Sequence, residues 1–125
     1  MNKLLAAILV TFTGCSCGAF SGKDDRVYAR GNDALILCEN GGFVADVATG
    51  TIEGRYTVNA DTSITATRGD DPATTYMLTF QADNTLATTN LGDGAWNELT
   101  LNKTELDHAD VRCTDLANRT WWSAQ

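Results

Sequence analysis

The sequence holds little of what metal-dependent or nucleophilic catalysis requires. Its 125 residues include one histidine, His108, and no Cys-x-x-C pair. A Ser-His-Asp triad would depend on that imidazole together with a distant aspartate, and no spacing supports such a set. The same scarcity argues against a zinc site built from cysteine and histidine pairs. We therefore expect no catalytic residue, no metal and no cofactor, and we expect that the protein is not an enzyme.

Basic residues are also in the minority. The chain has 9 Lys and Arg against 16 Asp and Glu, which gives a formal net charge of -7. Such a surface repels phosphate backbones and anionic lipid headgroups, so nucleic acid is not expected as a partner. A basic protein partner is attracted by the same charge. The charge also has a simpler role, which is to keep an exported domain soluble.

Long apolar runs are lacking, apart from one short run near the start. The run extends from Leu4 to Val10 after Lys3, and small or apolar residues continue it to Gly14, directly before Cys15. A membrane-spanning helix needs about 20 apolar residues, so this run is too short to be one. A basic start, a short apolar segment and a small residue before the cut are typical of a secretory signal.

The last residues of this segment, Phe12-Thr13-Gly14-Cys15, resemble the lipobox of bacterial lipoproteins. The resemblance implies that residues 1–14 are removed and that Cys15 becomes the first residue, carrying acyl chains such as palmitate. Because Ser16 and not aspartate follows, it also implies the outer membrane of the bacterial cell envelope. Several acyl chains anchor a protein stably. The alternative is an ordinary signal peptide that releases a soluble protein into the periplasm.

Two regions follow the signal. Residues 15–25 are small, polar and rich in glycine and serine, and this composition predicts a flexible tether. Residues 26–125 are enough for a single β-domain with a modest core.

Cysteine usage predicts one disulfide. If Cys15 carries lipid and Cys17 lies in the tether, Cys38 and Cys113 remain in the folded domain and are expected to pair. They are 75 positions apart, and closing a loop of that size stabilises the fold by about 4.5 kcal/mol in the chain-entropy model. Cys17 has three open possibilities: a free thiol, a small-molecule cap, or a bond to a second copy.

Short segments separated by turn residues make up the domain. Asn40-Gly41 between two apolar runs predicts a β-hairpin. Alternation of apolar and polar residues predicts the other strands. The expected strands are 27–30, 34–39, 43–47, 52–59, 63–67, 75–81, 86–90 and 96–102, followed by a bent strand over 103–113 and an extended segment over 119–123.

This order predicts an all-β fold, an antiparallel meander that closes into a small β-barrel or a curled sandwich. The disulfide is then expected to join the first and last strands of the sheet. The runs G-R-Y-T-V, Y-M-L-T-F and W-N-E-L-T-L resemble the strands of small lipocalin-like lipoprotein domains. The resemblance implies a lipocalin-like barrel.

Two groups of residues are candidates for a functional role. His108 has Asp107 and Asp110 nearby in the sequence, and we interpret this group as a hydrated surface cluster and not as a metal or general-base site. Trp96, Trp121 and Trp122 are possible contact anchors for a partner, although packing in the core is an alternative for the last two.

Together these observations favour a lipid-anchored envelope lipoprotein that acts as a binding or interaction module of unknown ligand. The membrane is its partner through the N-terminal lipid, and a protein partner, basic in character, is a further expectation. One alternative is an inhibitor of a basic exported hydrolase such as lysozyme, which the net charge and a resemblance to small lipoprotein lysozyme inhibitors suggest. Another is a carrier of a small apolar ligand.

Overall fold

The computed structural model describes residues 25–60 and 63–123 of the chain. The expected signal, Cys15, Cys17 and residues 15–24 of the expected tether lie outside the described residues. The elements are β1 (Arg26–Arg30), β2 (Asp33–Leu37), β3 (Gly42–Val47), β4 (Gly50–Val58), β5 (Ser63–Arg68), β6 (Thr75–Phe80), β7 (Thr85–Thr88), β8 (Trp96–Glu98) and α1 (Lys103–Leu116).

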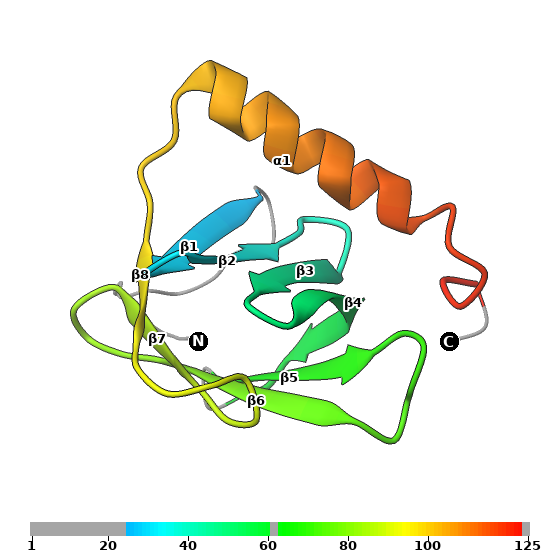
Figure 1. The fold of residues 1–125 in the computed structure, drawn as a ribbon, viewed down its shortest axis with the longest axis horizontal. Helices are drawn as coiled ribbons and strands as arrows, with labels where there is room; N and C mark the ends of the chain where they lie inside the picture. The colour runs from blue at the N-terminus through cyan, green and yellow to red at the C-terminus, as the bar shows by residue number, and fades with distance from the viewer. Residues whose placement is uncertain (1–24, 61–62, 124–125) are drawn as a thin grey trace.

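The strands form a closed antiparallel barrel in which each strand pairs with the next and β1 pairs with β8 (Figure 1). The predicted lipocalin-like all-β meander is therefore confirmed, in its barrel form. The hairpin at Asn40-Gly41 is also present: Leu37 lies opposite Phe43, and Gly41 adopts a φ of +90° that favours glycine. Closure leaves the sheet without a long unpaired edge.

The barrel interior is filled by side chains from alternate positions of the strands. Tyr56 is buried and Phe80 packs against this interior, whereas Leu99 lies outside with 42% of its surface exposed. The thirteen buried residues of the interior are Tyr28, Leu35, Leu37, Phe43, Ala45, Tyr56, Ile64, Ala66, Tyr76, Leu78, Leu86, Leu91 and Trp96.

The helix α1 corrects the strand predicted over 103–113. Strand β8 ends at Glu98, and α1 begins after Asn102, whose side chain accepts the backbone N–H of Glu105 while the Glu105 carboxylate accepts the N–H of Asn102. This capping box satisfies two backbone donors that the first helical turn leaves unpaired. Within the described residues, no helix is long and apolar enough to span a membrane.

One face of α1 packs on the outer surface of the barrel (Figure 1). Its buried residues Ala109, Cys113 and Leu116 are spaced i, i+4 and i+7, so they lie on one side of the helix. They contact Ile36 of β2 and Val44 of β3, which point outward from the sheet. We call these residues of α1, β2 and β3 the second cluster. It covers the outer faces of β2 and β3 while the barrel interior covers their inner faces, and for this reason both strands are almost continuously apolar.

The segment 119–123, expected to be extended, forms turns after the end of α1. Its two tryptophans pack against the second cluster on the outside of the barrel, and both are half-buried. The face of Trp121 lies against Gly69, where a Cβ would overlap the indole. Arg55 stacks over the Trp122 ring at 4.1 Å and donates a 2.7 Å hydrogen bond to the Trp122 carbonyl oxygen.

Candidate functional site

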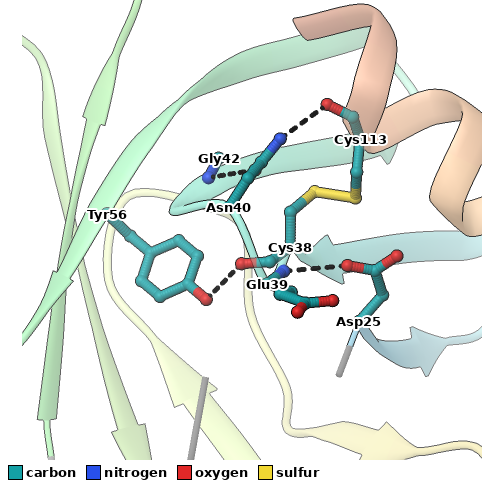
Figure 2. The surroundings of a disulfide bond; sticks show 7 residues. All are labelled: Asp25, Cys38, Glu39, Asn40, Gly42, Tyr56 and Cys113. Atoms are coloured by element: carbon teal, nitrogen blue, oxygen red, sulfur yellow. Dashed lines mark hydrogen bonds between the residues drawn. A yellow bond between two sulfur atoms is a disulfide. The ribbon is translucent and has the colours of Figure 1, made fainter. Parts of the chain in front are cut away.

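A disulfide joins α1 to the barrel (Figure 2). Cys38 directly follows β2 and Cys113 lies on α1, with their Cα atoms 5.7 Å apart, so the predicted pairing is confirmed. The expectation that it would join the first and last strands is wrong, because the sequence near Cys113 is helical. The bond therefore fixes the helix to the barrel, while hydrogen bonding between β1 and β8 closes the sheet.

Hydrogen bonds surround the disulfide and hold the adjoining chain in place (Figure 2). The Asn40 side chain donates to the Cys113 carbonyl oxygen at 3.0 Å and accepts from the Gly42 backbone N–H at 3.0 Å. From inside the barrel, the Tyr56 hydroxyl donates to the Cys38 carbonyl oxygen at 2.5 Å. Burial is the main cause that raises the pKa of Tyr56, which keeps the hydroxyl protonated and able to donate.

Asp25 lies beside the disulfide, where its carboxylate accepts the Glu39 backbone N–H at 2.8 Å. Its oxygen and the sulfurs of Cys38 and Cys113 lie within 4.8 Å of one another, the one such group of three potential metal ligands in the described ranges. Each sulfur is bonded to the other, so neither is a thiolate ligand. This arrangement does not form a metal site.

The C-terminal half of α1 and the chain after it are clamped by ion pairs. Arg112 donates two hydrogen bonds to the Asp46 carboxylate of β3, at 2.9 and 3.0 Å. These hydrogen bonds lower the pKa of Asp46. Arg119 makes a similar two-bond contact with Glu53 of β4, at 2.8 and 3.0 Å. This end of the helix is therefore occupied by contacts within the chain.

The N-terminal half of α1 stands away from the barrel and leaves an apolar groove of about 570 Å³, which we call the α1 groove. Ile36 and Ala109 are almost fully buried in its floor, whereas Leu99 and Val111 remain 42% and 58% exposed. Its lining residues are Val27, Ile36, Leu99, Leu101, Glu105, His108, Ala109, Val111 and Arg112.

Two further hollows that contain carboxylates lie near the α1 groove. A side hollow shares Val27, Leu99 and Leu101 with the groove and adds Asp25, Arg26, Glu98 and Leu106. Next to it lies a second hollow, here called the acidic hollow, lined by Asp25, Glu39, Asn40, Asp110, Cys113 and Thr114. No Lys or Arg lines the acidic hollow, so its electrostatic potential favours a cation.

The predicted histidine cluster lies at this groove but does not form one unit. His108 lines the α1 groove, whereas Asp107 pairs with Lys103 at 3.1 Å on the exposed side of the helix. Asp110 lies toward the acidic hollow. In a helix these three positions point in different directions, so the structure does not bring them together.

Trp96 lies on the opposite side of the sheet from the α1 groove, inside the barrel, with no exposed surface. The guanidinium of Arg30 stacks over its ring at 4.2 Å and also pairs with Asp33 at 2.8 Å. Trp96 thus serves the core near one end of the barrel and offers no surface to a partner. Trp121 and Trp122 are half-buried against the barrel exterior, where they hold the C-terminal turns in place.

Two sequence signals indicate the helix that borders the groove, and an analysis that assumes strands throughout overlooks both of them. Asn102 followed by Glu105 is a capping-box pattern, and Ala109, Cys113 and Leu116 recur at helical spacing. Comparison with models of protein families, with curated proteins and with solved structures gives no match. The groove and its charges are therefore interpreted from their own chemistry.

Proposed function

We propose that this chain is a lipid-anchored lipoprotein of the bacterial envelope that acts as a binding module through the α1 groove. The α1 groove is the observation that carries the proposal. Among the described residues, five large apolar side chains are exposed: Val58, Met77, Leu99, Leu106 and Val111. Three of them, Leu99, Leu106 and Val111, line the groove or its side hollow.

Binding at the groove fits the rest of the molecule. The interior of the barrel is filled by thirteen buried side chains, so we place the ligand outside the barrel and not within it. Apolar surface gathered in one concave place is typical of an interaction site. The disulfide and the Arg112 pair with Asp46 hold α1 against the barrel, so the groove is formed before any partner arrives.

Site-directed photocrosslinking in intact cells tests this proposal. A photoreactive residue replaces Val111 at the groove or, as the matched control, Met77 on β6, which is 40% exposed and lies away from α1. We expect a discrete crosslinked product from position 111 and none from position 77. The proposal fails if position 111 gives no product, or if both positions give the same products.

A further inference from the structure

We infer that the partner of the α1 groove is a protein segment in which an apolar side chain is flanked by lysine or arginine. This inference rests on the proposed function and specifies the chemistry of its ligand. It depends on two features, the apolar floor of the groove and the carboxylates of the acidic hollow, which the side hollow connects to the groove through Asp25.

The apolar part of the site fits side chains of a protein segment. The groove volume of about 570 Å³ lies within the range of small-ligand and side-chain pockets, which is about 300 to 1,000 Å³. Ile36 and Ala109 provide a buried floor, and Leu99 and Val111 lose exposed apolar surface when a side chain enters. Burial of that surface favours binding.

The charged part selects a cation. Glu39 and Asp110 line the acidic hollow, and neither carboxylate has a side-chain partner among the described residues. The cation that lines the groove itself, Arg112, is already held by Asp46 through two hydrogen bonds. A lysine or arginine that extends from the bound apolar residue into the acidic hollow therefore meets Glu39 and Asp110, which no cation of the described chain neutralises.

The same charges disfavour a phospholipid as the occupant. A phospholipid acyl chain matches the apolar floor, but its phosphate would approach Glu39, Asp110 and Glu105. Like charges brought together without a counterion oppose binding. A basic and apolar protein segment satisfies both parts of the site at once.

Peptide binding to the full-length processed chain, held in nanodiscs of neutral phosphatidylcholine, tests the inference. The probe is a short fluorescent peptide with a leucine-rich centre and lysines at both ends. One matched peptide has glutamates at its ends, and another keeps the lysines around a glycine-serine centre. Empty nanodiscs give the blank, and sodium laurate serves as the acyl-chain probe.

We expect the lysine peptide with the apolar centre to bind at least about tenfold more tightly than either matched peptide at low ionic strength, with the difference shrinking as salt is added. The pair of changes Glu39→Gln and Asp110→Asn should weaken it about fivefold, since each exposed charge contact contributes modestly. The control Asp93→Asn, in the exposed loop before β8, should leave binding unchanged.

Val111→Asp tests the apolar part and should abolish measurable binding, whereas Met77→Asp on β6 should not. Equal binding of the lysine and glutamate peptides, no effect of the Glu39 and Asp110 changes, or binding of laurate alone would each overturn the inferred chemistry. If one of these results is obtained but position 111 still gives a crosslinked product in cells, the binding-module proposal is kept and the basic, apolar partner is rejected. If that crosslink is absent, the proposed function itself fails.

Discussion

At the scale of single residues, Tyr56 connects the barrel interior to the disulfide. Its side chain is 8% exposed, and its hydroxyl donates to the buried carbonyl oxygen of Cys38. Tyr56→Phe removes this donor, while the Gly41 backbone N–H still donates to the same oxygen at 3.1 Å, and a hydrogen bond of this kind contributes about 0.5 to 1.5 kcal/mol. We expect urea unfolding to show a decrease of that size with an unchanged denaturant slope. A variant as stable as the wild type would show that the hydrogen bond contributes nothing.

Buried tyrosines also predict how stability depends on alkaline pH. Burial, with a smaller contribution from Glu98, raises the pKa of Tyr28 from 10.0 to about 12. The folded state therefore holds this proton more tightly than the unfolded state. The stabilisation is complete below pH 10, the unfolded value, and is lost as the pH rises toward about 12, at no more than about 1.4 kcal/mol per pH unit.

Tyr28→Phe isolates this contribution. Between pH 10 and about 12 the free energy of unfolding of the variant should fall less steeply than that of the wild type. Chemical denaturation at a series of pH values measures both slopes. Parallel slopes would mean that Tyr28 does not titrate differently in the two states.

At the scale of elements, the disulfide holds α1 on the barrel. The side chains of α1 that contact the barrel are few, and Ala109, Cys113 and Leu116 are the buried residues of the helix. Replacing Cys38 and Cys113 by alanine removes the cross-link, and loss of a native disulfide costs about 2 to 5 kcal/mol. Because β1 and β8 close the barrel directly, we expect the strands to remain paired while α1 loosens.

Hydrogen exchange followed by mass spectrometry distinguishes the two elements. In the double alanine variant, amides of α1 should lose protection before those of β4 and β5, which pair along their length in the barrel wall. Uniform loss of protection throughout the domain would show that helix and barrel unfold as one unit.

The barrel was predictable from the sequence because its strands carry local signals. Apolar residues alternate along β4 and β6, and Asn40-Gly41 marks a turn. The helix was missed because its apolar face is narrow: β-sheet reasoning through 103–113 overlooked the capping box at Asn102 and Glu105. The groove depends on how α1 crosses the barrel, and such a tertiary arrangement has no local signal.

Trp96 and the disulfide show which features the sequence alone could predict and which depend on tertiary packing. Trp96 was a candidate contact anchor for a partner, but the structure places it in the barrel interior with no exposed surface. The disulfide partners were predicted correctly by elimination among four cysteines, although the element that contains Cys113 was not. The cysteine pairing could be predicted from the number and positions of the cysteines. Which side of a short strand is buried depends on the elements that pack around it.

At the scale of the whole molecule, the groove lies near the start of the folded domain. Asp25, the first described residue, lines both hollows beside the α1 groove. If Cys15 is acylated, the residues between it and Asp25 span at most about 35 Å when fully extended. The proposed anchor therefore keeps the groove within that distance of the bilayer, and partners at or near the membrane surface are the ones it can reach.

The intact mass of the protein purified from bacterial envelopes tests the anchored module most directly. The account predicts a chain that begins at Cys15 and carries a diacylglyceryl group and an amide-linked acyl chain, and predicts that Cys15→Ser releases the protein from the membrane fraction. An unmodified Cys15 on a chain found free of the membrane would contradict it.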